Sequence, residues 1–280
     1  MGARRKRAIG AHVPVGGGLV KTGVAEAEAI GAEVLQIFLG SPRGWALPKV
    51  DDEAAERFRE ECAARKWPVY VHASYLINLA SPDPDAVKRS VEHLRAALAA
   101  SAKVGAAGVV VHAGSSIDGD REAALGRLAG TFGAVLEDAP DSLRLLVEPT
   151  AGAANAMAWT FESTAEYIDA VGIPEVGLCL DTCHLHAAGE ALADRRKLNA
   201  SLKALDAAIG AGRVGLVHYN DSKDPMGSRR DRHETLGEGI LGDEGLAAVA
   251  AAPLLKGVPL VSETPTREHD VAHAKELDRT

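Results

Sequence analysis

The chain has 280 residues and a formal net charge of −8, with 46% hydrophobic and 25% charged residues. This composition is typical of a soluble globular chain that can bury a large core, and no apolar run is long enough for a transmembrane helix. The negative charge argues against a nucleic-acid partner unless some of the carboxylates hold metal ions. Composition therefore leaves the class of partner open.

The chain begins with a basic segment, residues 1–7, that leads into no apolar signal region. We expect a frayed terminus and a cytoplasmic protein. The three cysteines, Cys62, Cys179 and Cys183, form no C-x-x-C pair, which fits a reducing compartment. Cys179 and Cys183 flank a motif rich in potential metal ligands, yet we interpret the cysteines as small buried hydrophobes rather than soft ligands.

Short β-branched runs alternate along the chain with long Ala/Leu-rich helical patterns. The predicted strands are 8–13, 34–39, 69–72, 108–112, 143–148, 176–181, 214–218 and 259–263. The predicted helices are 18–31, 52–66, 82–104, 121–138, 161–171, 193–210 and 243–252, with a last one in the charged tail after Thr264. Eight strands with intervening helices predict one (β/α)₈ TIM barrel over residues 1–280, in preference to an open doubly wound sheet.

Two predicted connections are too long to be simple links, namely 40–45 after the second strand and 219–241 after the seventh. Long loops that follow barrel strands lie on the face where active sites are found. We therefore expect both loops to border the functional site.

Six of the eight predicted strands end in a residue that can bind a metal ion. These residues are His72, His112, Glu148, Asp181, His218 and Glu263. Because the carboxyl ends of parallel barrel strands share one rim, the six side chains should converge. His184 would share a face with Asp181 if a helical turn starts there, and Asp231 and His233 would share one side of an extended segment.

Five imidazoles and four carboxylates suit Zn²⁺, with Mn²⁺ or Fe²⁺ possible at one or more positions. Nine such ligands can hold two or three ions and leave places for water, as in a catalytic site. Clustered ions lower the pKa of a shared water and neutralise charge on a phosphodiester. No side-chain general base is needed, so the catalytic candidates Glu148, Glu263 and His112 are metal ligands.

Of the other histidines, His12 ends the first strand and is expected to support the ligands. We expect His93, His186, His269 and His273 to be structural or surface residues.

At the level of local motifs, the chain resembles the endonuclease IV family of apurinic/apyrimidinic endonucleases over nearly its whole length. The matching segments are GAHV (10–13), HASYLINLA (72–80), VHAGS (111–115), EPTAG (148–152), DTCH (181–184) followed by AAG (187–189), HYNDSK (218–223), RDRHE (230–234) leading to GEG (237–239), and ETP (263–265). Each segment alone is weak, and their common order is specific.

The resemblance implies three zinc ions. His72 and His112 would hold the first, Asp181, His218 and Glu263 the second, with Glu148 bridging the pair. His184, Asp231 and His233 would hold the third. The resemblance also implies hydrolysis 5′ to an abasic site by a water shared between the first two ions, leaving a 3′-hydroxyl and a 5′-deoxyribose phosphate. The implied partner is double-stranded DNA with abasic sites or blocked 3′ ends, and we expect action as a monomer.

Family members insert side chains into bent DNA, and the matching positions here are Arg43, Tyr75 and Leu76. Inserted side chains unstack base steps, and a nucleotide without a base is the easiest to extrude. We expect phosphate contacts from the cations of the second long loop, which are Lys223, Arg229, Arg230 and Arg232. A solvated loop is the alternative for each of them.

Two positions depart from the family pattern. Ala113 follows His112 where the family usually has proline, and Pro149 follows Glu148 where it usually has asparagine. The ligands survive both changes, so we expect effects on rate or substrate preference rather than on the type of reaction.

Two other functions fit part of the pattern. A metal-dependent barrel sugar isomerase or epimerase would share the carboxylate-rich mouth, but it has no use for the third metal that Asp231 and His233 would supply. A protein that binds abasic DNA without cutting it is the second alternative, and the complete ligand set argues against it.

Overall fold

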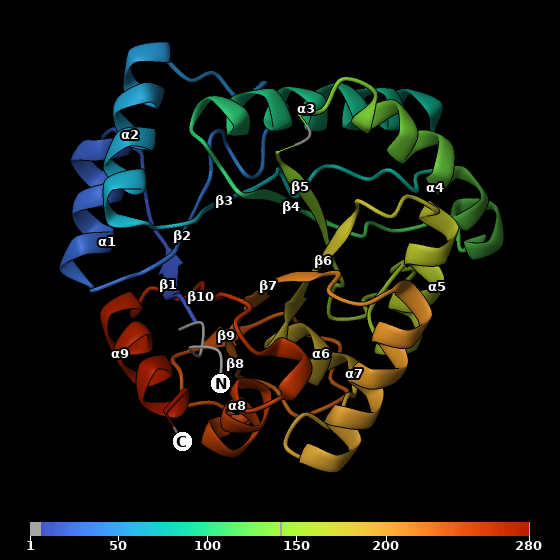
Figure 1. The fold of residues 1–280 in the computed structure, drawn as a ribbon. Helices are drawn as coiled ribbons and strands as arrows, with labels where there is room; N and C mark the ends of the chain where they lie inside the picture. The colour runs from blue at the N-terminus through green and yellow to red at the C-terminus, as the bar shows by residue number, and fades with distance from the viewer. Residues whose placement is uncertain (1–6, 141, 280) are drawn as a thin grey trace.

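The computed structural model describes residues 7–140 and 142–279 and contains a closed barrel of parallel strands in the order β1-β10-β7-β6-β5-β4-β3-β2. The barrel strands are β1 (Ile9–His12), β2 (Leu35–Ile37), β3 (Val69–His72), β4 (Gly108–His112), β5 (Arg144–Glu148), β6 (Gly177–Asp181), β7 (Val214–His218) and β10 (Leu260–Ser262). The helices surround these strands (Figure 1). The predicted TIM barrel is confirmed.

The helices follow the predicted order, with local differences. They are η1 (Leu19–Val24), α1 (Ala25–Ala29), α2 (Asp52–Arg65), α3 (Pro84–Lys103), α4 (Arg121–Leu136), α5 (Phe161–Val171), α6 (Thr182–Ala188), α7 (Arg195–Ile209), α8 (Gly242–Ala250), η2 (Pro253–Leu255) and α9 (Arg267–Leu277). The predicted helix 18–31 begins as a π-helical segment before α1. A short helix, α6, follows β6 directly, and the connection 219–241 contains the small antiparallel pair β8 (Asp221–Ser222) and β9 (His233–Glu234).

The core has two layers, one inside the barrel and one between strands and helices. Since side chains alternate along a strand, every second residue points into the barrel. The inner layer consists of Val34, Tyr70, Val110, Leu146, Cys179, Leu216 and Val261. The larger outer cluster joins strand residues such as Val109 to helix residues such as Phe132.

The N-terminal segment differs from the prediction at Arg7. Residues 1–6 lie outside the described residues, but the side chain of Arg7 is buried. Its guanidinium donates to the carbonyls of Ala250 and Leu255 and pairs with Asp278 at 2.7 Å. The expectation of a frayed terminus is therefore wrong at Arg7, because the guanidinium is tied to the C-terminal part of the chain.

Within residues 7–140 and 142–279, none of the helices combines the length and the apolar character that crossing a bilayer requires.

Candidate metal centre

The residues above the inner apolar layer form a continuous polar layer. Seven of its eight members lie two positions beyond a residue of the inner layer, so they also point into the barrel, one layer nearer the carboxyl ends of the strands, and the eighth, His12, ends β1. The layer consists of His12, Gln36, His72, His112, Glu148, Asp181, His218 and Glu263. Strand register places His112 opposite Glu148 and Asp181 opposite His218. The six predicted strand-end ligands thus meet at one rim.

The first group of potential ligands consists of His72, His112 and Glu148. The Nδ1 of His72 lies 2.8 Å from the carbonyl of Ala73, which can only accept, so this nitrogen carries the proton. Its Nε2 faces Oε2 of Glu148 at 3.1 Å, and Nε2 of His112 lies 3.3 Å from the same oxygen. A buried carboxylate oxygen flanked by two imidazole nitrogens is a donor set that could hold a metal ion.

The second group consists of Glu148, Asp181, His218 and Glu263, whose ligand atoms lie within 4.8 Å of one another. The Nδ1 of His218 is 2.9 Å from Oε1 of Glu148 and 3.2 Å from Oε2 of Glu263. Glu148 belongs to both groups and is buried between them.

The third group lies outside the barrel. Asp181 caps α6 by accepting the backbone N–H of His184 at 2.8 Å, so His184 projects from the first turn of that helix. Its Nε2 is 3.2 Å from Oδ1 of Asp231, and Nε2 of His233 is 3.1 Å from the same oxygen. The predicted helical turn and the predicted extended segment thus bring His184, Asp231 and His233 together.

The electrostatics of the cluster favour a bound cation. Burial would raise the pKa of Glu148, but the neighbouring imidazoles of His218, His112 and His184 hold that pKa well below its usual range. Burial opposes charge on His218 as well, yet Cys179, Glu263 and Glu148 raise its pKa well above the usual value. The carboxylates thus stay ionised and attract positive charge, which protons on the imidazoles supply in the absence of a metal and which a zinc ion could supply in their place.

Two amide side chains that the motif analysis did not single out as functional hold these ligands. Asn220 donates to Oδ2 of Asp181 at 2.7 Å and to Oε2 of Glu263 at 3.2 Å. Gln36 contacts Glu263, His218 and His12. His12 therefore has the supporting position expected of it, one contact away from the ligands. The periodicity of the strands could have revealed Gln36, which stands two residues after the buried Val34.

The cysteines are free and buried. The thiol of Cys183 comes within 4.8 Å of ligand atoms of Asp231 and His233. Burial, its largest influence, raises the pKa of Cys183 to about 12. This agrees with the interpretation of the cysteines as buried hydrophobes.

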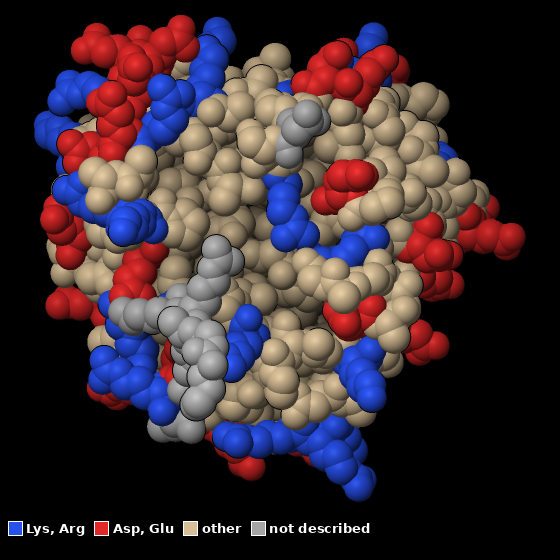
Figure 2. Space-filling view, in the orientation of Figure 1, with Lys and Arg blue, Asp and Glu red and all other residues tan. Residues whose placement is uncertain are grey.

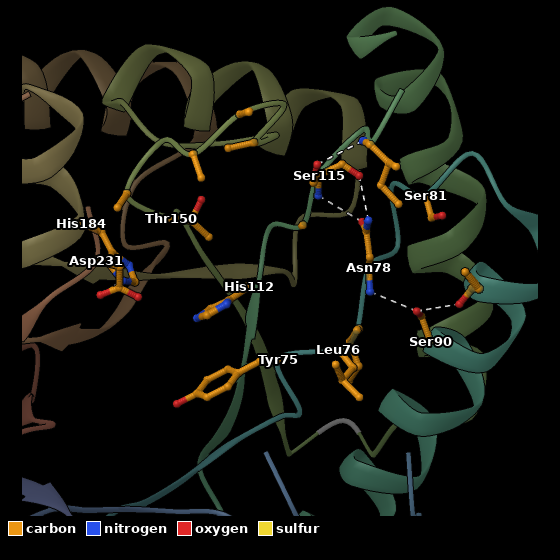
Figure 3. Close-up of a pocket in the computed structure, with 18 of the residues that line it drawn as sticks. Tyr75, Leu76, Asn78, Ser81, Ser90, His112, Ser115, Thr150, His184 and Asp231 are labelled. Carbon is orange, nitrogen blue, oxygen red and sulfur yellow. Dashed lines mark hydrogen bonds and ion pairs between the residues drawn. The ribbon is translucent and has the colours of Figure 1, made fainter. Parts of the chain in front are cut away.

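Two adjoining cavities open over the polar layer. The first, about 450 Å³, is lined by ligands of all three groups together with Arg43 and Tyr75. The second, about 550 Å³, begins at His112, His184 and Asp231 and extends along small residues toward Asn78. Figure 3 shows His184 and Asp231 on one side of this cavity, Asn78 and Ser115 on the other, with Tyr75 and His112 between them.

The residues expected to insert into DNA lie on two loops that are joined. Tyr75 is 42% and Leu76 38% exposed, and Arg43 is also exposed at the cavity edge. The Tyr75 ring stacks on His112 with centroids 5.2 Å apart. The N–H of Tyr75 donates to the carbonyl of Pro42 at 2.9 Å, and the Ser74 hydroxyl donates to the same carbonyl at 3.1 Å.

The cations of the second long loop fall into two kinds. Arg232 forms a two-pronged ion pair with Asp224, and Arg230 lies 3.6 Å from the same carboxylate. The ammonium of Lys223 is 3.9 Å from Glu234. Arg229 has no carboxylate partner among residues 7–140 and 142–279, and it lines the larger cavity. Arg229 is therefore the cation of this loop most available to a ligand.

The buried carboxylate of Asp221 holds this loop by accepting backbone hydrogen bonds. Asp221 accepts the backbone N–H groups of Ser222 at 2.7 Å and of Gly237, Gly239 and Gly242 at 3.1 Å each. These bonds tie both ends of the segment that carries Asp231 and His233 to the end of β7.

Charges of both signs alternate around the edge of the face seen in Figure 2. The net negative charge is therefore not gathered into one field on that face.

The two departures from the family pattern have distinct local effects. The N–H of Ala113 donates to the carbonyl of Glu148 at 2.9 Å, a bond that proline could not make. Proline at 149 keeps its backbone carbonyl, which lies 3.0 Å from Nδ1 of His184, so this contact with a potential ligand does not depend on the departure. Neither departure disturbs the ligand groups.

The comparisons with known proteins agree with this geometry. The family model of the xylose isomerase-like TIM barrel matches residues 24–279. A probable endonuclease 4 of Streptomyces avermitilis is 41% identical over 277 residues, which are 97% of this chain and 88% of the relative. The crystal structure of endonuclease IV from Thermus thermophilus superposes with a TM-score of 0.82 at 34% identity and covers 97% of each chain.

The chain belongs to the endonuclease IV family. The resemblance inferred from the motifs is thereby confirmed, and with it the prediction of an enzyme of the nuclease type. A D-tagatose 3-epimerase-like protein superposes with a TM-score of 0.71 at 20% identity, covering 97% of this chain and 96% of its own. At that identity the likeness shows the shared barrel and no more, so the sugar-epimerase alternative has the fold as its only support.

Proposed function

We propose that the chain is a zinc-dependent DNA repair endonuclease that hydrolyses the phosphodiester 5′ to an abasic site and leaves a 3′-hydroxyl and a 5′-deoxyribose phosphate. The endonuclease 4 relatives support a DNA repair endonuclease with DNA as its substrate. The observation that supports the finer statement is the convergence of nine potential nitrogen and oxygen ligands in three groups, seven of which line one open cavity.

In this proposal His72, His112 and Glu148 hold the first zinc ion. Glu148, Asp181, His218 and Glu263 hold the second, and His184, Asp231 and His233 hold the third. When bound, the three ions supply a water of lowered pKa and positive charge for the phosphodiester. Mn²⁺ or Fe²⁺ would suit the same donors at one or more positions.

The protein groups position the DNA. Arg43, Tyr75 and Leu76 would enter a base step, and their loops are joined by one backbone hydrogen bond and one hydroxyl hydrogen bond to the carbonyl of Pro42. Arg229, which lines the larger cavity, would contact a phosphate. Lys223, Arg230 and Arg232 add positive charge, although their carboxylate partners reduce what each contributes.

The test is incision of a labelled duplex that carries one tetrahydrofuran analogue of an abasic site, before and after prolonged chelation. We expect cutting 5′ to the analogue, loss of cutting on chelation, and its return with Zn²⁺. His112→Ala and Glu263→Ala should abolish cutting. Tight binding to the analogue without cutting would favour a DNA-binding protein, and neither cutting nor binding by the metal-loaded protein would overturn the proposal.

A further inference from the structure

Two of the eight residues in the polar layer, His12 and Gln36, belong to none of the three ligand groups. Gln36 is completely buried and is the only glutamine in the chain. Its amide lies between two ligands of the second group, Glu263 and His218.

The chemistry of these neighbours fixes the orientation of the Gln36 amide. An ionised carboxylate can only accept hydrogen bonds, so the amide nitrogen must be the atom that faces Oε1 of Glu263, at 2.6 Å. The amide oxygen then faces Nε2 of His218 at 2.7 Å, and that nitrogen must carry the proton. The second amide N–H points to Nδ1 of His12 at 3.1 Å, which accepts it. Both amide N–H groups and one lone pair of the amide oxygen are therefore used.

This orientation determines what the two ligands offer to the site. In the neutral imidazole that a metal ligand requires, the proton of His218 lies on Nε2, so Nδ1 keeps a lone pair, and this atom is the one that faces Glu148 at 2.9 Å. With Oε1 of Glu263 held by Gln36, Oε2 is the oxygen turned toward His218, at 3.2 Å. One amide therefore selects one atom on each of two ligands.

We propose that Gln36 is a positioning residue that sets the tautomer of His218 and the carboxylate orientation of Glu263 for the second metal ion. The inference rests on the proposed function for the presence of that ion. Partners of this kind change metal affinity by about 10–100-fold when they are removed. Because Gln36 is completely buried, it cannot touch DNA, and its loss should lower kcat while the KM for DNA stays unchanged.

The experiment compares the wild type with Gln36→Met, which fills a similar volume without hydrogen bonds, and with Phe132→Leu, which disturbs the core at α4 away from the ligands. Zinc is titrated into each apoprotein in competition with a chromophoric chelator. Glutamine labelled with ¹⁵N on its side chain gives one NH₂ group to follow by NMR, because the chain has a single glutamine. Incision kinetics are measured on the same samples.

We expect Gln36→Met to weaken one zinc site by about 10–100-fold, and the NH₂ signal of the wild type to shift as that site fills. Phe132→Leu should lower the melting temperature and leave zinc affinity unchanged. Equal zinc affinity in the wild type and Gln36→Met, or an NH₂ signal indifferent to zinc, would overturn the inference alone. A wild type that binds zinc without cutting would overturn the proposed function and leave this comparison valid, whereas a wild type that binds no zinc would overturn both.

Discussion

The buried carboxylate of Asp221 is the most consequential side chain outside the ligand groups, and Asp221→Asn tests its role. Its two oxygens accept four backbone N–H groups, two on each oxygen. Asparagine has one such oxygen, so two N–H groups would face an amide NH₂ and lose their acceptor. A hydrogen bond to a charged group contributes about 1.5–3 kcal/mol, so the free energy of unfolding should fall by about 3–6 kcal/mol.

For a domain of this size, that loss corresponds to a fall in Tm on the order of 10 °C. Asp206→Asn at the end of α7 is the matched control, because Asp206 accepts only the N–H of Gly212 from outside its helix, at 3.2 Å. Asp221→Asn should also lose one zinc ion relative to the wild type, since Asp231 and His233 lie on the segment that Asp221 secures. Thermal unfolding of the zinc-free proteins and zinc content after dialysis measure the two effects. A Tm within about 2 °C of the control, with unchanged zinc content, would refute the reasoning.

Three further predictions concern DNA contact, backbone strain and pH. Arg229→Ala should weaken binding to lesion DNA and reduce the slope of log K against log salt by about one. Lys197→Ala on α7 is the control and should change neither quantity. Equal slopes for the wild type and Arg229→Ala in filter binding would show that Arg229 does not contact the DNA. Gly114→Ala should destabilise the protein by about 1–3 kcal/mol in urea unfolding, because φ is +78° and a Cβ would stand 2.3 Å from Oδ1 of Asn78. Gly126→Ala, in an open position within α4, should not destabilise, and a similar loss there would contradict the strain argument. Burial lowers the pKa of His93, so the unfolded chain takes up a proton below about pH 6.5 that the native state resists, and stability is lost as the pH falls. His93→Phe, which keeps a ring against Trp45, should therefore lose less stability than the wild type between about pH 7.5 and 5.5, and equal losses would exclude this contribution.

The sequence was sufficient for the barrel and for the assembly of the ligands, because both depend on short-range rules. The strand ends follow from β-branched runs, and parallel strands bring residues as distant as His72 and Glu263 to one rim. His184 and Asp231 were predictable from a capped helical turn and an extended segment. Residues whose roles depend on a partner chosen in three dimensions could not be predicted in this way. The side chain of Arg7 turns into the fold because carbonyls near Ala250 need donors, and Arg232 is held by Asp224.

Gln36 is an intermediate case. Glutamine is not a usual metal ligand, so its residue type gives no signal for a metal site. The alternation that places Val34 inside the barrel also places Gln36 in the polar layer, so its position along the chain predicts where it lies. Asn220 offers no comparable signal, because it follows the end of β7, where strand periodicity no longer applies.

The hydrogen bonds between Tyr75, Ser74 and Pro42 have a consequence for selectivity in the proposed function. They join the two loops before any DNA arrives, so the inserting side chains need little ordering when they bind. A rigid probe of this kind presents the same shape to every base step along a duplex. Discrimination must then come from the DNA, because an intact step resists separation and a step without a base yields. The protein would find damage by testing the local stiffness of the duplex rather than by recognising a chemical group.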